Sequence, residues 1–427
     1  MAPPSDNRHQ SIHNAHLMWH GREFFGSYQE LVLNSAFQPI FSLAHKRMVG
    51  VEALVRGRNA DGKAVMPDQL FQLPGTLDDQ LHLDRIIRSM HVGNFSVMQR
   101  HPAWLFLNLN PNLIIHGARN GVLFTEELLQ NFGVSSHQIV VELLEKRIAD
   151  EQALEEVIAH YRAMNCLIAI DDFGAGRSNF DRIWRFRPDI IKFDRSLIVH
   201  AACNPLARRI LPSLVKLAHE VGCLALIEGI ETEEEALIAM DCDADFVQGY
   251  LFARPVAWVA LPQHAAAPLV SQLSSQWRSV MEQDQQAWQH TVEPYKAAFA
   301  VALQAIRQDT TIEIASRSLL AAHPQIRRCF LLNNDGVQIS HNIGRHRSLA
   351  SSQHDMDQDR FSPLNDAEQA DWSRRPYFRQ AMQHPEQIQV VGPYLSIPDL
   401  SLCLTLSASI LHHGERMVYC CDLDFSG

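Results

Sequence analysis

Eight polar side chains in this 427-residue sequence follow short apolar runs, at points where a buried strand would end. They are Glu52, Asn108, Glu142, Asp171, Asp172, Lys192, Glu228 and Gln248. Charged residues avoid buried strands unless they are paired or bind a metal. A single case is an ordinary strand end that meets solvent, whereas eight such positions indicate one shared site.

The chemistry of this set is that of a hard-cation site. Carboxylate and amide oxygens, without thiolate or imidazole, favour Mg²⁺ or Mn²⁺. Five carboxylates in one place also require nearby positive charge. Two cations about 3.5 to 4 Å apart would supply it and would hold the attacking and leaving oxygens of a phosphodiester.

Two basic residues fit the same chemistry. Lys192 suits a group that orients or deprotonates the attacking water, although charge balance with Asp194 or Asp171 is an alternative. Arg56 lies four residues after Glu52 and suits a bidentate contact to phosphate.

The stretch VEALVRG at 51–57 therefore has two interpretations. It is either a strand edge with two exposed charges, or a strand end and its following turn that bring a carboxylate and a guanidinium to one pocket. The recurrence of polar residues at other strand ends favours the second interpretation.

The elements that must position these residues alternate from about residue 36 to 255. The expected strands are 36–43, 48–55, 104–110, 138–145, 166–174, 189–194, 223–231 and 244–252. Amphipathic stretches such as 78–99 and 150–165 repeat apolar residues at three and four positions and predict helices. Repeated strand–helix–strand order predicts a closed α/β barrel, in which the carboxyl ends of the strands meet at one mouth.

The length of the chain predicts more than one domain. We expect an N-terminal extension at 1–29, the barrel at 30–262, a helical linker of one or two long helices at 263–312, and a smaller α+β domain at 313–427. In the last of these, Asn334-Asp335-Gly336 marks a turn between strands and 345–370 a long polar loop.

Composition limits the function classes. The net charge of -11 disfavours DNA binding, which requires a broad basic surface. No signal-peptide core and no run of about 18 apolar residues is present, so we expect no membrane span. The eight cysteines are scattered and match neither a disulfide framework nor a zinc site. A cytoplasmic protein with reduced thiols is expected.

Ordered motifs resemble those of EAL domains, the phosphodiesterases that linearise cyclic di-GMP. They are FQPIFSL at 37–43, EALVR at 52–56, NLN at 108–110, VVELLE at 140–145, DDFGAGRSNF at 171–180, PDIIKFDRSLI at 188–198, EGIET at 228–232 and QGYLFARP at 248–255. The tripeptide EAL is weak evidence alone, but the ordered set covers about residues 30 to 260.

The resemblance implies a (β/α)₈-like barrel whose first strand runs antiparallel to the others. It also implies hydrolysis of cyclic di-GMP to linear pGpG with two Mg²⁺ or Mn²⁺ ions. The residues that match the metal ligands of the family are Glu52, Asn108, Glu142, Asp171, Asp172 and Glu228.

Further roles come from the same resemblance. Lys192 matches the water-activating lysine, with Gln248 in support. Substrate contacts are implied for Gln38, Leu54, Arg56, Asn108 and Asp194. Glu145 matches the glutamate that anchors the loop at 172–180, which in this family couples metal binding to dimerisation, so a homodimer is expected.

Departures from the family pattern are few. The loop commonly reads DFGTGYSS, so Ala175, Arg177 and Asn179 differ, and Asn110 stands where serine is frequent. No residue of the metal set is lost. An active phosphodiesterase is therefore the leading hypothesis. The alternatives are a non-catalytic cyclic di-GMP receptor and a barrel enzyme that acts on another phosphodiester.

The C-terminal part resembles small sensor folds of the PAS and Cache type, through FLLNNDGVQIS at 330–340 and WSRRPYFRQAM at 372–382. In that resemblance, Trp372, Arg374, Arg375 and Tyr377 would bind a small anionic or amino-acid-like ligand. The alternative is that these side chains only pack the domain.

Overall fold

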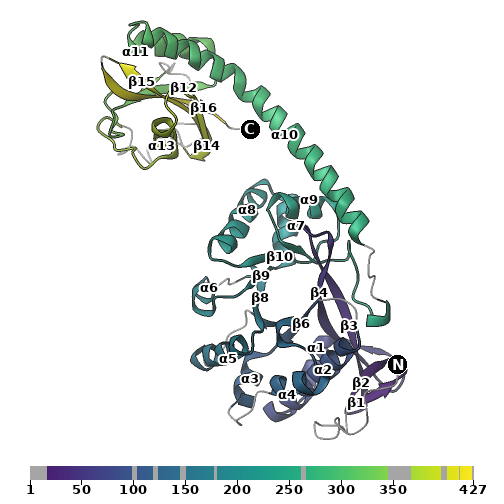
Figure 1. Ribbon diagram of the computed structural model, residues 1–427. Helices are drawn as coiled ribbons and strands as arrows, with labels where there is room; N and C mark the ends of the chain where they lie inside the picture. The colour runs from purple at the N-terminus through teal and green to yellow at the C-terminus, as the bar shows by residue number, and fades with distance from the viewer. Residues whose placement is uncertain are drawn as a thin grey trace, which may run out of the picture. The chain divides into compact units, whose positions relative to one another are not determined.

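The structure is a computed structural model that describes residues 17–98, 103–118, 124–144, 151–176, 180–260, 266–344, 367–395, 402–412 and 414–425. It divides into two compact units, Met1–Val280 and Met281–Gly427 (Figure 1). None of the helices in the described part of the chain combines the length and apolarity needed to cross a membrane.

The first unit is built on a ring of eight strands. They are β3 (Leu31–Ser42), β4 (Arg47–Arg58), β6 (Trp104–Leu109), β7 (Ile139–Leu144), β8 (Leu167–Phe173), β9 (Ile190–Phe193), β10 (Leu224–Ile227) and β11 (Phe246–Val247). The order β3-β11-β10-β9-β8-β7-β6-β4 closes because β3 also pairs with β4. Strand β3 is antiparallel to β4 and β11, and the remaining pairs are parallel. The predicted barrel, including its antiparallel first strand, is confirmed.

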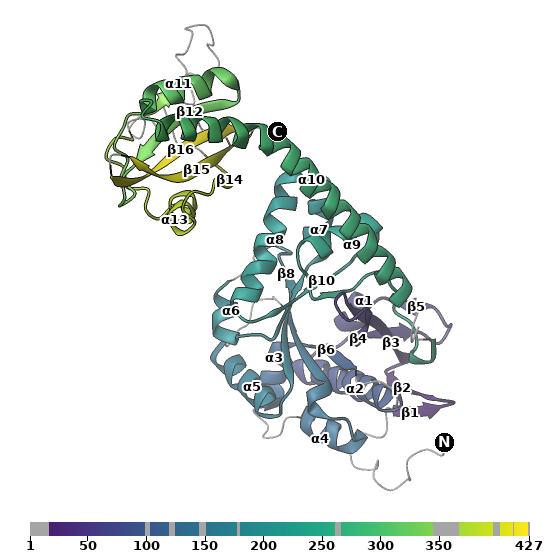
Figure 2. The same ribbon diagram turned by 45° about the horizontal axis from the view of Figure 1, so that its top comes forward.

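Helices cover the outside of this ring (Figures 1 and 2). They are α1 (Pro67–Gln72), α2 (Leu77–Ser96), α3 (Pro111–Ala118), α4 (Phe124–Phe132), α5 (Glu151–Ala163), α6 (Asp181–Phe186), α7 (Arg195–Cys203), α8 (Pro205–Glu220) and α9 (Glu233–Asp241). Side chains cap several of them. Thr76 accepts from the backbone N–H of Asp79 at the start of α2, and Asn204 accepts from two N–H groups at the start of α8.

The barrel interior is closed by one apolar layer. Its buried members come one from each of seven strands: Ile40, Phe106, Val140, Ala169, Ile190, Leu226 and Phe246. Their neighbours along each strand, such as Ile191 and Phe193 on β9, pack in other clusters with the surrounding helices. This alternation follows from the period of two in a β-strand, and it makes the interior a packed core rather than a pore.

Gly50 of β4 faces this layer where only hydrogen fits. A Cβ there would lie 2.8 Å from Cε2 of Phe106 and 3.1 Å from the carbonyl oxygen of Trp104. We predict that Gly50→Ala lowers the free energy of unfolding by about 1 to 3 kcal/mol, because overpacking forces the side chain of Phe106 to move. Urea denaturation measures this. Gly75→Ala is the control, since its Cβ meets nothing within 4 Å, and an equal loss in both variants would contradict the packing argument.

Two strands that were not predicted from the sequence precede the barrel. They are β1 (Leu17–His20) and β2 (Glu23–Tyr28), which form a hairpin whose second strand pairs with β3. The N-terminal extension predicted at 1–29 thus contains sheet. Its signal was the turn His20-Gly21-Arg22 between apolar residues, with Gly21 at a φ of +66°.

His91 of α2 is buried beneath this edge of the sheet. Its Nδ1 lies 2.8 Å from Oγ of Ser35, and Asn94 donates to the same hydroxyl at 3.0 Å. Burial, together with the charge of Arg56, lowers the pKa of His91 from 6.5 to about 3. The folded protein therefore keeps this ring neutral at a pH where an unfolded histidine takes up a proton.

The lowered pKa of His91 makes the folded protein less stable as pH falls. As pH falls from about 6.5 towards 3, only the unfolded state gains this proton, so stability falls by up to about 1.4 kcal/mol per pH unit from this residue. We predict a flatter stability–pH profile for His91→Gln than for the wild type in urea denaturation. The exposed His200→Gln is the control, and parallel profiles for wild type and His91→Gln would disprove the assignment.

Helix α10 (Ala266–Arg307) is 42 residues long and contains Pro294. In the first unit, its residues Val270 and Leu273 are fully buried in the core that also holds α7, α8 and β10. The helix continues past Val280 into the second unit, where Phe299 stacks on Tyr419 at 5.2 Å.

The second unit is a small α+β fold, as predicted. Its antiparallel sheet has the order β13 (Ile343–Gly344), β12 (Ile326–Leu332), β16 (Glu415–Asp424), β15 (Leu402–His412) and β14 (Gln389–Leu395), with helices α11 (Ile312–Ala322) and α13 (Pro376–Gln383). The predicted turn is present: Gly336 has a φ of +86°, and Asn333 Oδ1 accepts from the N–H groups of Asp335 and Val337. Most of the expected polar loop at 345–370 lies outside the described residues.

Candidate active site

A polar layer lies directly above the apolar layer of the barrel. On six strands the polar residue stands two positions after the interior apolar one: Asn108 after Phe106, Glu142 after Val140, Asp171 after Ala169, Lys192 after Ile190, Glu228 after Leu226 and Gln248 after Phe246. On the antiparallel strand β3, Gln38 precedes Ile40 by two. The period of two therefore turns all these side chains towards the barrel axis at the same mouth.

Lys192 holds three of the carboxylates together. Its Nζ lies 2.9 Å from Asp171 Oδ1, 2.6 Å from Glu228 Oε1, and also contacts Glu142 Oε1. Lys192 and Glu142 are 1% and 0% exposed. Of the two acids considered as charge partners for Lys192, Asp171 is in contact, so the lysine does neutralise charge here.

Two side-chain amides hold Glu52 in the polar layer. Asn108 donates to its Oε1 and Gln248 to its Oε2, each at 2.8 Å. Glu52 does not stand at a strand end, as the sequence analysis had it. Strand β4 continues to Arg58, because its hairpin with β3 stays paired from Ser42↔Arg47 to Val32↔Arg58. The prediction of a strand end and a following turn at 51–57 is therefore wrong.

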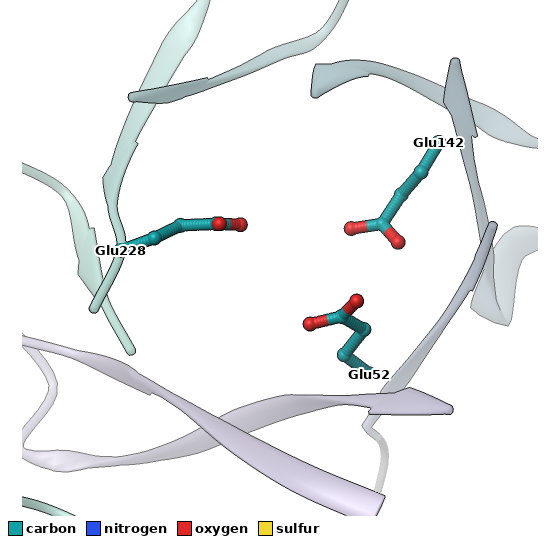
Figure 3. Close-up of side chains that lie close together, drawn as sticks. All are labelled: Glu52, Glu142 and Glu228. Carbon is teal, nitrogen blue, oxygen red and sulfur yellow. The ribbon is translucent and has the colours of Figure 1, made fainter. Parts of the chain in front are cut away.

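The acidic side chains converge from opposite sides of the barrel (Figure 3). Glu52, Glu142 and Glu228 each place one oxygen within 4.8 Å of the others, and Asp171, Asp172 and Glu228 form a second such group. Glu142 Oε2 is buried and has no hydrogen-bond partner among the described residues. A buried carboxylate oxygen without a donor is costly, and an all-oxygen set of this kind fits a hard divalent cation.

Burial and like charge control the ionisation of these groups. Burial raises the pKa of Glu142 well above its ordinary value, although Lys192 opposes the shift. Burial also raises the pKa of Glu228 to about 8, again against the effect of Lys192. For Lys192 itself, burial lowers the pKa, but the four carboxylates around it outweigh burial and raise the pKa well above its usual range. Lys192 is therefore an ammonium ion in this arrangement.

Backbone geometry directs Asp172 into its place. Asp172 has a φ of +58°, and its N–H donates to Asp171 Oδ1 at 3.0 Å. Strained backbone of this kind costs about 1 to 3 kcal/mol and concentrates at functional sites. This backbone conformation lets two consecutive acids lie at the same mouth of the barrel. In a regular strand, their side chains would point to opposite faces of the sheet.

Three further predicted site residues, Gln38, Leu54 and Arg56, lie along the β3–β4 hairpin. Gln38 sits opposite Glu52 in the β3–β4 register, and Leu54 and Arg56 follow on the same face of β4. Their neighbours Val51, Ala53 and Val55 are at most 6% exposed, whereas Gln38, Leu54 and Arg56 are half-buried. This face thus extends the polar layer along the hairpin.

Asp194 and Glu145 are placed differently. Asp194 caps α7, with its Oδ1 accepting from the N–H of Ser196 at 2.9 Å. Glu145 lies outside the described residues, as do 177–179 of the loop that it was predicted to anchor.

Glu235 was missed by the sequence analysis. It is 7% exposed, and its Oε2 accepts from the N–H groups of Glu231 at 2.7 Å and Thr232 at 3.0 Å. These bonds fix the segment that follows Glu228. The signal was Thr232 followed three residues later by Glu235, the capping box of α9.

Comparison with solved structures shows the same fold. The Bacillus subtilis YkuI protein, crystallised with cyclic di-GMP and calcium, superimposes with a TM-score of 0.78 at 22% identity. The match covers 92% of this chain and 97% of that one. Both units of the present chain therefore have counterparts in a known fold.

Curated relatives match the barrel. The cyclic di-GMP phosphodiesterase RocR of Pseudomonas aeruginosa is 28% identical over 224 residues, which is 52% of this chain and 56% of RocR. The probable cyclic di-GMP phosphodiesterase PdeB of Escherichia coli is 28% identical over 221 residues, 51% of this chain and 42% of PdeB. The chain thus spans about half the length of the curated relatives it matches.

The EAL domain family model matches residues 29–255, more than half of the chain, and these residues include the whole polar layer. This chain belongs to the EAL-domain family.

Proposed function

We propose that this chain hydrolyses cyclic di-GMP to linear pGpG. The observation that carries the proposal is the group of carboxylates around Lys192, in which a buried oxygen of Glu142 has no donor in the part of the chain that the structure describes. RocR and PdeB, which match the same barrel, bear the name of cyclic di-GMP phosphodiesterases. The carboxylates of this layer could hold the divalent cations that hydrolysis of a phosphodiester uses.

The proposal includes two divalent cations, Mg²⁺ or Mn²⁺. The residues that would hold them are Glu52, Asn108, Glu142, Asp171, Asp172 and Glu228. When bound, such cations polarise a phosphodiester and make water a better nucleophile at neutral pH.

The side chains around them would bind and orient. Lys192 is positioned to hold a proton beside the acids and to orient water, and Gln248 fixes the carboxylate of Glu52. Arg56, with Gln38 and Leu54 beside it on the hairpin face, would bind a phosphate and the adjoining nucleotide.

Purified protein incubated with cyclic di-GMP and Mn²⁺, followed by chromatography, tests this function. We expect pGpG to form and EDTA to stop its formation. Tight binding of cyclic di-GMP without product would instead favour the non-catalytic receptor. Faster cleavage of bis-p-nitrophenyl phosphate than of cyclic di-GMP would favour another phosphodiester as substrate.

We further propose that the second unit regulates this activity by binding a small ligand. A cavity of about 40 Å³ lies among Arg328, Gln338, Trp372, Arg375, Tyr377, Tyr394 and Asp422. Arg374, considered in the sequence analysis, is exposed and does not line it. One water needs about 10 to 15 Å³, so this space fits a ligand of a few non-hydrogen atoms.

Several polar side chains that line the cavity bond to one another. Arg328 Nε donates to Asp422 Oδ2 at 2.7 Å, Thr405 donates to Asp422 Oδ1 at 2.6 Å, and Trp372 donates to Gln338 at 3.1 Å. The hydrolysis assay, repeated with formate, acetate or methylammonium, tests regulation. No change in rate with any of them would count against it.

Deletion of the second unit is best made after Val280. A cut at residue 262 would remove Val270 and Leu273 from the barrel core. We also propose the homodimer expected for this family, which sedimentation of the full chain with and without Mn²⁺ would test.

A further inference from the structure

A large cavity lies at the end of the barrel opposite the acidic layer. Its volume is about 860 Å³, within the range of roughly 300 to 1,000 Å³ typical of small-molecule sites. The lining residues come from the β3–β4 turn, the amino ends of β6, β7, β10 and β11, and helix α10. All of them belong to the first unit.

The two ends of the barrel are separate. The apolar layer of Phe106, Val140 and Leu226 stands between them, and Phe246 of that layer contacts Trp104 edge-on, with ring centroids 5.8 Å apart. Trp104 and Phe246 also line the cavity. A ligand here would rest on the base of the barrel core and would not reach the catalytic mouth.

Two tryptophans line the cavity. Trp104 lies at the amino end of β6 and Trp277 lies on α10. Their indole rings offer apolar surface on which a planar ring could stack.

The charged rim of the cavity is mainly basic. Lys46, Arg47 and Arg278 line it, and among the described residues no carboxylate lies within ion-pair distance of any of the three. Two acids, Asp243 and Asp245, also line the cavity. Of these, Asp245 Oδ2 accepts from the N–H of Ala225 at 2.8 Å and lies 2.9 Å from His219 Nε2. Unpaired cations around one cavity are notable in a chain with a net charge of -11.

We propose that this cavity is a second ligand site, for a nucleoside monophosphate. The base would lie against the indoles, and the phosphate would meet Arg47, Arg278 and Lys46. Because Trp277 and Arg278 lie on α10, the ligand would join the base of the barrel to the helix that continues to Arg307.

Equilibrium dialysis of the full chain with GMP, in EDTA and at low salt, tests the site. We expect saturable binding that guanosine and inorganic phosphate each reproduce at least about tenfold more weakly, since each keeps only one half of the contacts. Arg47→Glu and Arg278→Glu should each weaken GMP binding by about tenfold or more. The exposed Arg209→Glu on α8 is the matched control and should leave binding unchanged.

Two further variants separate this site from the others. Trp277→Ala should weaken GMP binding by about tenfold or more, whereas Trp277→Phe, which keeps an aromatic ring, should weaken it less. Arg56→Ala should have no effect, because Arg56 belongs to the opposite mouth. No saturable binding of GMP or AMP would overturn the proposal, as would guanosine binding as tightly as GMP, or loss of binding in Arg56→Ala. None of these results depends on hydrolysis of cyclic di-GMP.

Discussion

Glu52→Ala should lower the rate of cyclic di-GMP hydrolysis by about three orders of magnitude. A cation that loses a ligand supplies less transition-state stabilisation, and a loss of about 4 kcal/mol corresponds to a thousandfold. The rate is measured as pGpG formed in saturating Mn²⁺. Because Asn108 and Gln248 both donate to Glu52, the variant also leaves two amide donors without an acceptor.

A fold defect must therefore be distinguished from a catalytic one. The thermal unfolding of Glu52→Ala, recorded by circular dichroism, should remain cooperative at the assay temperature. Glu220→Ala, an exposed carboxylate at the end of α8, controls for loss of negative charge and should keep the wild-type rate. If folded Glu52→Ala turned over substrate at a rate near that of the wild type, Glu52 would not be a ligand.

Lys192→Met should affect both stability and catalysis. In EDTA, removal of the ammonium leaves the buried Glu142 and the half-buried Glu228 without their partner, and breaking such a buried pair costs about 3 to 5 kcal/mol. Urea denaturation in EDTA measures this loss. Divalent cations should raise the stability of the variant more than that of the wild type, because the cations then replace the missing charge.

The rate of hydrolysis by Lys192→Met in Mn²⁺ should fall by about 10² to 10⁴, the usual contribution of a group that transfers or holds a proton. Lys216→Met is the matched control: its side chain is 76% exposed and pairs with Glu220 at 3.7 Å, so its loss should be small. Wild-type turnover by folded Lys192→Met would limit Lys192 to charge balance, the alternative that its contact with Asp171 leaves open.

Much of the barrel could be predicted from sequence because its pattern is local. Apolar runs that end in a polar residue mark both a buried strand and its functional end, so all eight strands and the members of the polar layer were identified. The same logic missed β1 and β2, whose apolar runs are only two or three residues long and whose residues are mostly exposed or half-buried. It also failed at Glu52, because the length of a strand depends on its partner. Residues 51–57 remain extended since β3 continues alongside them.

The residues of the site could be predicted from the sequence, but the contacts between them could not. The sequence alone determined which atoms are available: five carboxylates, two amides and one lysine, all of which except Asp172 follow the period of two of a strand. Only the tertiary structure decided their contacts, because the closure of β3 on β4 and β11 is a long-range event that no local spacing encodes. It placed Lys192 between three acids, left an oxygen of Glu142 with no donor among the described residues, and formed a cavity at the far end of the barrel from residues far apart in the sequence. Those contacts depend on which strands become neighbours, and burial then gives them their energy.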